Sequence, residues 1–210
     1  MEYRPLGRTG LYISTICLGT MTWGGRGRWE AIGQVGQEAV NEQLKCAVEA
    51  GVNFIDTANV YHEGWSEELL GQAIRDTGIP REDLVIATKV RGRMRSGING
   101  MGLTRVHIHH EVDASLRRLG LDHIDLYQIH GLDPLTPIDE TLWALDDLVR
   151  SGKVRYIGIS NQAAWRIAKA NEIARANRWS RFESVQAYYT LAGRDLEREV
   201  LPMYREESFG

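Results

Sequence analysis

Short apolar runs alternate along this chain with longer segments in which apolar residues recur every three or four positions. The short runs lie at about residues 16–20, 52–55, 84–89, 124–130, 154–160 and 184–186. Their length and apolar character are typical of buried parallel strands. The periodic segments are predicted helices, which begin at about residues 37, 66, 104, 137, 162 and 196. Gly51, Gly120 and Gly152 follow three of them, as expected where a helix ends.

Six consecutive strand–helix units predict a parallel sheet with helices on its outside. Ahead of them, residues 2–14 have the pattern of a small hairpin with its turn at residues 7–10. An open dinucleotide-binding sheet is the alternative, and it should carry G-x-G-x-x-G after its first strand. Residues 19–25 do not fit that pattern. We therefore expect a TIM (β/α)8-type barrel, in which the carboxyl ends of several strands form one site.

Polar side chains suited to acid–base chemistry stand at the carboxyl ends of the predicted strands. They are Asp56 with nearby Tyr61, Lys89, His130, Ser160 with Asn161, and Gln186. An ordinary Asx-type turn after a strand would also explain the segment that contains Asp56. A tyrosine is a poor proton donor at neutral pH unless a neighbouring cation favours its anion, and Lys89 is the candidate cation. Asp56 is the expected partner of Lys89, and His130 could orient a substrate oxygen or pass a proton.

The motifs resemble the aldo-keto reductase family along nearly the whole chain. The matching stretches, in family order, are Asp56-x-x-x-x-Tyr61, Lys89 at a strand end, Gln128-Ile129-His130, Gly158-Ile159-Ser160-Asn161 and Val185-Gln186-Ala187-Tyr188-Tyr189. Within the family the chain looks closest to the bacterial branch related to the potassium-channel beta subunits. The resemblance implies a TIM barrel that reduces an aldehyde or ketone with NADPH by hydride transfer.

The same resemblance implies a role for each matching residue. Tyr61 would be the general acid, Lys89 and Asp56 would tune its pKa, and His130 would position the carbonyl. The cofactor-binding residues would be Thr20, Asp56, Ser160, Asn161 and Gln186, of which the last three would hold the nicotinamide carboxamide. Trp23 would form a wall of the substrate pocket, although an anchor for its glycine-rich loop is the alternative.

The resemblance also predicts that the chain is incomplete, as one barrel domain over residues 1–210 with six of eight strand–helix units. The sequence ends at Ser208-Phe209-Gly210, where a seventh strand would begin. Unpaired first and sixth strands predict exposed barrel edges, through which copies of the chain could associate. The explanations are a truncated form or frameshifted gene, a second chain that supplies the rest, or a shortened protein with another role.

Two other functions compete with carbonyl reduction. The first is a non-catalytic module that binds a cofactor or a partner, which the channel-beta resemblance and the open edges allow. The second is another barrel enzyme, such as an isomerase or hydrolase. The amide cluster of Asn161 and Gln186 disfavours the second, because those chemistries have no evident use for a carboxamide clamp.

The amino-acid composition limits the classes of binding partner and the cellular location that we expect. The 25 basic and 28 acidic residues give a net charge of −3, which does not favour nucleic acid or an anionic membrane as a partner. No apolar run is long enough to span a membrane, and the N-terminus lacks a signal-peptide pattern, so the protein is predicted to be cytoplasmic. Cys17 and Cys46 are predicted to be small buried apolar residues rather than a disulfide or a metal pair.

Three further groups attract functional interpretations that we discount. His107, His109 and His110 lack a suitably spaced acid or cysteine for a metal site, and a solvated helix face is expected. The arginines at 91, 93 and 95 could attract an anion, but a solvated loop is expected. Trp143, Trp165 and Trp179 lie on or beside predicted helices, where packing in the core or against the barrel is the default.

Overall fold

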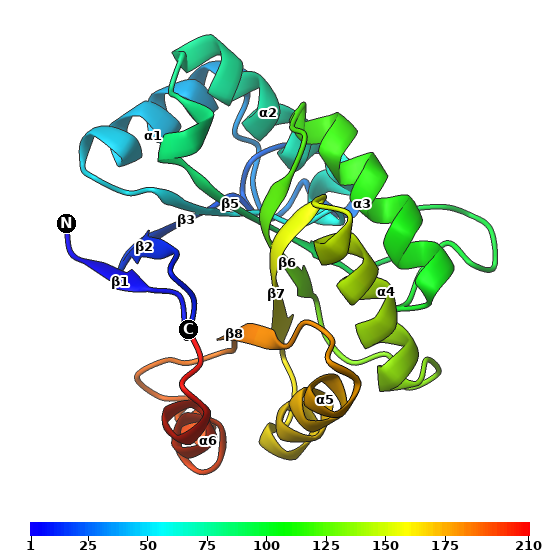
Figure 1. The fold of residues 1–210 in the computed structure, drawn as a ribbon. Helices are drawn as coiled ribbons and strands as arrows, with labels where there is room; N and C mark the ends of the chain where they lie inside the picture. Colours follow the sequence, from blue (N-terminus) through cyan, green and yellow to red (C-terminus); the bar gives the residue numbers. More distant parts are fainter.

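Six parallel strands form a curled sheet in the computed structural model, which describes residues 1–27 and 29–210. The strands follow chain order and are β3 (Cys17–Gly19), β4 (Phe54–Asp56), β5 (Val85–Val90), β6 (Ile124–Ile129), β7 (Val154–Ser160) and β8 (Phe182–Gln186). Figure 1 shows the helices in an arc around the outside of this sheet. The arrangement is a half-barrel, so the predicted barrel topology is confirmed over the six units present.

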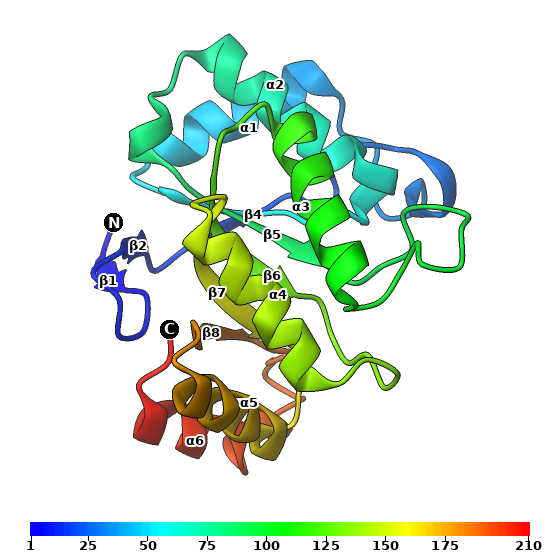
Figure 2. The same cartoon turned by 45° about the vertical axis from the view of Figure 1, so that its right-hand side comes forward.

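Each strand is followed by a connection that contains a helix. The helices are α1 (Gln37–Glu49), α2 (Trp65–Thr77), α3 (Arg105–Leu119), α4 (Ile138–Arg150), α5 (Ala164–Asn177) and α6 (Val200–Glu207), with short 3-10 turns η1 (Gly27–Trp29), η2 (Tyr61–Gly64), η3 (Arg81–Asp83) and η4 (Asp195–Glu197). Figure 2 shows α3, α4 and α5 following one another around the outer face, where consecutive helices are in contact. The main core lies between these helices and the sheet.

The predicted hairpin is present and closes one end of the half-barrel. Its strands β1 (Tyr3–Pro5) and β2 (Tyr12–Ser14) pair antiparallel, and the turn between them contains Gly7 with φ of 57°. Leu6 packs on the inner face of the sheet against Ala87 and Leu126. The interior of the half-barrel is therefore filled at its amino end, and its carboxyl end is left for the polar residues.

The two outer strands of the sheet have different surroundings. Beyond β8, the amide of Gly210 donates to the Glu183 carbonyl at 2.8 Å, and the amide of Val185 donates to the Gly210 carbonyl at 3.0 Å. These two bonds place Gly210 beside β8 in the manner of a parallel neighbour. On the other side, Cys17 of β3 is exposed. The prediction that Cys17 is buried is wrong, because β3 is at the edge of the sheet and has a neighbouring strand on one side only.

Three other sequence-based expectations differ from the structure. Cys46 is exposed on α1 rather than buried. Trp143 and Trp165 are exposed, and Arg105 and Arg166 respectively lie over their rings, whereas Trp179 packs on the core as predicted. The three exposed side chains differ from prediction for one reason. Helical spacing identifies a helix, but the side of the helix that faces the sheet is set by the neighbouring helices.

Five of the six helices begin within two residues of the predicted positions, whereas α6 begins at Val200 rather than at about residue 196. Thr104 caps α3, since its hydroxyl accepts a hydrogen bond from the His107 amide at 3.3 Å. Ser66 lies in the first turn of α2, which begins at Trp65, and its hydroxyl donates to the Thr20 carbonyl. Thr136 donates to Asp133, and Pro137 occupies the cap position of α4.

Candidate active site

Strand register brings four polar side chains to the inner face at the carboxyl end of the half-barrel. Lys89 of β5 lies beside Gln128 of β6, and Asp56 ends β4 next to Ala87 of β5. Alternate residues of a strand point to opposite faces, so Gln128 and His130 project to the same side. The sheet therefore gathers residues that are up to 74 positions apart in the sequence, the separation of Asp56 and His130.

Asp56 and Lys89 form a buried ion pair at the centre of this group. Lys89 Nζ donates to Asp56 Oδ2 at 2.5 Å and to the Thr57 carbonyl at 2.9 Å. The second carboxylate oxygen of Asp56 accepts from Gln128 Nε2 at 3.0 Å. The Lys89 side chain is fully buried. Both charges are thus paired and hydrogen-bonded, which is what makes their burial tolerable.

The segment after Asp56 is held across the end of β5 by its backbone. The amide of Thr57 donates to the Ala87 carbonyl at 2.9 Å, and the amide of Asn59 donates to the Lys89 carbonyl at 3.2 Å. The Asn59 side chain turns the other way and donates to Glu111 of α3 at 3.1 Å. These contacts fix the chain that leads to Tyr61, and the Asp56 side chain bonds Lys89 and Gln128 rather than the backbone amides of an Asx-type turn.

Tyr61 lies over Lys89 and between two aromatic rings. Lys89 Nζ is 5.3 Å from the centre of the Tyr61 ring, and the His130 ring meets it edge to face at 5.7 Å. Burial raises the pKa of the Tyr61 hydroxyl, the positive charge of Lys89 opposes that increase, and the negative charge of Asp56 adds to it. The net increase means that burial outweighs Lys89 here, so Tyr61 holds its proton at neutral pH.

His130 is a neutral imidazole in this environment. Burial is the largest cause, and together with the positive charges of Lys89 and Arg91 it lowers the pKa of His130 from 6.5 to about 4. A neutral imidazole has one N–H donor and one acceptor nitrogen. Next to Tyr61, His130 can therefore donate a hydrogen bond to a substrate oxygen without carrying a charge.

His62 is a positioning residue that the sequence did not reveal. It follows Tyr61 with φ of 49° and is completely buried. Its Nδ1 accepts from the Gly25 amide at 2.8 Å, and its Nε2 lies 2.9 Å from the Met21 carbonyl. With Nδ1 accepting, the proton belongs on Nε2, which donates to Met21. The ring therefore ties residues 21–25 to the turn that carries Tyr61.

Close packing around His62 explains one glycine of the loop. A Cβ at Gly24 would come within 2.4 Å of the His62 ring, and Gly24 has φ of 139°. Trp29 lies farther along the same loop. The centre of its ring is 5.6 Å from that of the Tyr61 ring and 5.9 Å from that of the His62 ring. Beside Trp29, Met94 and Arg95 line an open hollow of about 510 Å³. The loop thus forms a wall next to the tyrosine.

A buried polar network supports the site from behind, between the sheet and helices α2 and α3. Arg118 Nε donates to Glu67 at 2.6 Å, and Thr88 donates to the other oxygen of Glu67 at 2.6 Å. Arg118 also lies 3.8 Å from Glu111, the acceptor of Asn59. Nothing in the local sequence marks Glu67 or Glu111 as buried, because Glu67 of α2 meets Arg118 of α3, and Glu111 meets Asn59 from the segment after β4.

The residues predicted to hold a nicotinamide carboxamide lie close together at the ends of β7 and β8. Ser160 is paired with Gln186 in the sheet register, and the Asn161 amide donates to the Gln186 carbonyl at 3.1 Å. Asn161 Nδ2 also donates to Ser160 Oγ at 3.0 Å. Asn161 and Gln186 are exposed, so their amides can meet a ligand. A hydroxyl and two amides supply the donors and acceptors that a planar carboxamide needs.

Thr20 and Trp23 lie deeper than the sequence suggested. The Thr20 hydroxyl is buried, 2.8 Å from the Ser66 hydroxyl of α2. Trp23 is also buried in the core, and its indole donates to Gln43 of α1 at 2.7 Å. These contacts favour the alternative in which Trp23 anchors its loop, while Trp29 is the tryptophan beside Tyr61.

The arginines and histidines for which we expected a solvated surface differ in their exposure. Arg93 and Arg95 are exposed, as predicted. His107 is completely buried, so the solvated-face prediction is wrong for it, and burial lowers its pKa. The packing of α3 against the 92–95 loop, rather than helical spacing, decides its exposure. Within the described part of the chain, no three His, Cys, Asp or Glu side chains are grouped as a metal ion would require.

The family comparison agrees with this geometry. The model of the aldo/keto reductase family matches residues 15–210, which is all of the chain after the hairpin. The chain belongs to the aldo/keto reductase family. Its half-barrel and the clustered Asp56, Tyr61, Lys89 and His130 are thus parts of an aldo-keto reductase.

Relatives of this aldo-keto reductase come from fungi and bacteria. Versiconal hemiacetal acetate reductase of Aspergillus parasiticus is 40% identical over 96% of this chain and 63% of its own length. The uncharacterized oxidoreductase YrpG of Bacillus subtilis is 40% identical over 100% of this chain and 64% of its own length. Norsolorinic acid reductase of Emericella nidulans is 40% identical over 94% of this chain and 52% of its own length. The chain therefore spans less than two thirds of each of these relatives.

The α-helices that the structure describes contain between 8 and 15 residues each. In the described residues, none has the length and apolar character that crossing a membrane would need.

Proposed function

We propose that this chain carries the catalytic group of an NADPH-dependent reductase that converts an aldehyde or ketone to an alcohol. The observation that supports it most is the assembly of Tyr61 over the buried Asp56–Lys89 pair, with neutral His130 at the edge of the tyrosine ring. Family membership gives the reductase class, whereas the cofactor and the residue roles are our proposal.

The proton chemistry follows from the environment of each side chain. Tyr61 is protonated at neutral pH and gives its proton to the carbonyl oxygen as that oxygen gains charge. Lys89 stabilises the tyrosinate that remains, and Asp56 holds Lys89 in place through the ion pair. His130 donates a hydrogen bond to the same oxygen and aligns the carbonyl.

The residues at the ends of β7 and β8 fit a reduced nicotinamide. Ser160, Asn161 and Gln186 would hold its carboxamide, and the bound cofactor would supply the hydride for the carbonyl carbon. Gln186 is exposed at the strand end, where it can accept such a ligand. A role for Thr20 would be to support Asp56, whose carbonyl accepts from the Thr20 amide at 3.0 Å.

Aromatic carbonyl compounds are the substrates we propose. Two relatives are named as reductases of versiconal hemiacetal acetate and of norsolorinic acid, and a third, from Schizosaccharomyces pombe, as a putative aryl-alcohol dehydrogenase. Trp29 and Met94 provide an apolar wall beside Tyr61 on which an aromatic body could lie. Association through the edge strands and a cytoplasmic location stay predictions.

The test separates the proton transfer from cofactor binding. We expect Tyr61→Phe to lower the turnover of dimethoxybenzaldehyde about 100-fold or more, because general acid catalysis contributes about 10² to 10⁴. NADPH affinity should change less than about twofold, because the hydroxyl acts in the transition state. Turnover is followed by NADPH absorbance, and affinity by fluorescence.

A matched control is Tyr12→Phe, which removes a hydroxyl from an exposed tyrosine of the hairpin. It should leave both turnover and affinity at the wild-type level. Wild-type turnover in Tyr61→Phe would remove Tyr61 as the acid. Absence of any turnover in the wild-type chain, with NADPH bound, would refute the proposed activity for this chain.

A further inference from the structure

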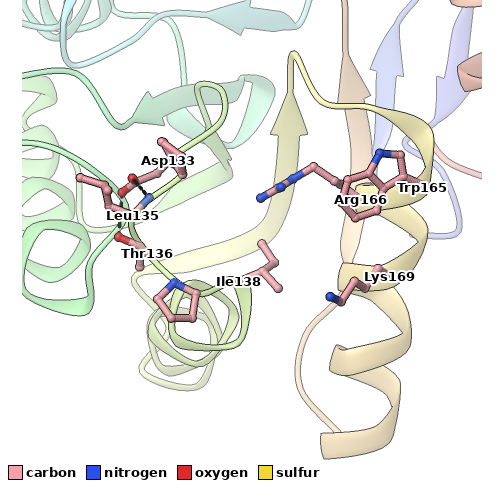
Figure 3. A pocket seen from close by; sticks show the side chains of 9 residues that line it. Asp133, Leu135, Thr136, Ile138, Trp165, Arg166 and Lys169 are labelled. Atoms are coloured by element: carbon pink, nitrogen blue, oxygen red, sulfur yellow. Dashed lines mark hydrogen bonds between the residues drawn. The ribbon is translucent and has the colours of Figure 1, made fainter.

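A cleft with two unpaired cations lies outside the catalytic group, between the loop that follows β6 and the start of α5. Its volume is about 290 Å³. One wall is formed by residues 133–138, and the other by Trp165, Arg166 and Lys169 of α5. Figure 3 shows the Arg166 and Lys169 side chains extending from α5 into the space opposite Asp133 and Thr136.

The two cations have no anionic partner in the protein. Across the described residues, neither the Arg166 guanidinium nor the Lys169 ammonium makes a hydrogen bond or ion pair, and the Arg166 guanidinium lies 5.3 Å from the centre of the Trp165 ring. Arg166 is also half-buried, and it lines a small inner cavity next to Ile129 and Ile159. A half-buried guanidinium with free donors is a site at which a carboxylate or phosphate can bind with two hydrogen bonds.

The end of α5 adds to the positive potential of the cleft. Arg166 stands in the first turn of α5, which contains no acidic residue and no side-chain cap. A cation at this end of a helix is unfavourable, because the helix dipole is positive there. The helix dipole and the two cations all favour an anion in the cleft. A bound anion would offset the repulsion between Arg166 and the positive end of the α5 dipole.

On the opposite wall, the Asp133 carboxylate already has hydrogen-bond donors within the protein. Asp133 accepts hydrogen bonds from the Leu103 amide at 2.7 Å, the Leu135 amide at 3.0 Å and the Thr136 hydroxyl at 2.7 Å. These bonds lower the pKa of Asp133 against the opposing effect of burial, so it is ionised. Its oxygens are engaged by the loop, and Asp133 makes no ion pair with Arg166 or Lys169.

Apolar side chains gather at the same opening. Leu135 is 90% exposed and Trp165 is 59% exposed, and Ile138 lines the cleft between them. Large exposed apolar side chains around one cleft are a common mark of a binding site. An indole beside a guanidinium suits a flat ligand with an acidic group.

From this juxtaposition we propose that the cleft between residues 133–138 and α5 binds an aromatic carboxylate, with Arg166 and Lys169 on the carboxylate and Trp165, Leu135 and Ile138 on the ring. The site is separate from the catalytic group, so the proposal does not depend on the reductase function. A volume of about 290 Å³ suits a ligand of one or two rings.

Isothermal titration of the 210-residue chain with naphthoate tests the proposal. We expect saturable binding with a Kd of about 1 mM or tighter. The neutral naphthylmethanol should bind about tenfold more weakly or worse, as should naphthoate to Arg166→Gln, because each change removes a charge-assisted contact. Naphthoate binding should also weaken as salt is raised.

The control is Arg198→Gln, which removes a solvent-exposed arginine elsewhere on the surface. It should bind naphthoate like the wild type, and circular dichroism should show that both variants are folded. Equal affinities for naphthoate and naphthylmethanol would overturn the proposal. Unchanged naphthoate affinity in Arg166→Gln would also overturn it, because binding would then take place elsewhere.

Discussion

Removing the Lys89 charge should destabilise the protein strongly, and removing its partner as well should restore a large part of the lost stability. The perturbation is Lys89→Met, which keeps the length of the side chain and deletes the ammonium. In the wild type, that ammonium bonds Asp56 Oδ2 at 2.5 Å and the Thr57 carbonyl at 2.9 Å. After the change, the Asp56 carboxylate keeps only its hydrogen bond from Gln128.

The magnitude follows from the burial of the pair. The Lys89 side chain is fully buried and that of Asp56 is 11% exposed, so water cannot replace the lost partner effectively. Breaking a buried ion pair costs about 3–5 kcal/mol, largely because one charge is left without its partner. Domains of this kind have a free energy of unfolding of about 5–15 kcal/mol, so the loss should be obvious.

Urea unfolding followed by tryptophan fluorescence measures the effect for Lys89→Met, Asp56→Asn and the double variant. The double variant should be more stable than Lys89→Met by about 2 kcal/mol or more, because it contains no unpaired buried charge. If the double variant were as unstable as Lys89→Met, or less stable, the cost would come from packing and not from the unpaired carboxylate.

Two further predictions concern the histidines. His62→Ala should release residues 21–25, seen as faster hydrogen exchange of the Gly25 amide, and His62→Asn should restore protection because an amide oxygen can replace the Nδ1 acceptor; equal exchange in wild type and His62→Ala would contradict the tie. His130 has a pKa of about 4 when folded and 6.5 as the ordinary value, so between these pH values only the unfolded chain takes up its proton. Wild-type stability should therefore fall by up to about 3 kcal/mol relative to His130→Gln as pH falls through this window. A pH-independent difference between the two would mean that His130 is not held neutral.

The sequence predicted the elements and the centre of the site for a physical reason. Parallel strands are buried on both faces, so a charged residue at the end of an apolar run, such as Asp56 or Lys89, is conspicuous. Strand order then places the carboxyl ends together, and the group of Tyr61, Lys89 and His130 follows from topology alone.

Contacts between distant elements account for what the sequence did not reveal. His62 looks like an ordinary polar turn residue, and only the path of the 21–27 loop over it makes it a buried tie. His107 has the spacing of a solvated position, yet α3 packs so that it is buried. Cys17 has the pattern of a buried strand and is exposed because β3 is at the edge of the sheet. Exposure in each case depends on a neighbour that local periodicity does not encode.

The most direct test of the central claim is an NADPH titration of the 210-residue chain, followed by nicotinamide and tryptophan fluorescence, with the intact mass recorded on the same sample. We expect saturable binding that weakens in Gln186→Ala, because Gln186 belongs to the group at the ends of β7 and β8 that fits the carboxamide. No saturable binding by a chain of confirmed mass would contradict the claim that this half-barrel carries a working nicotinamide site.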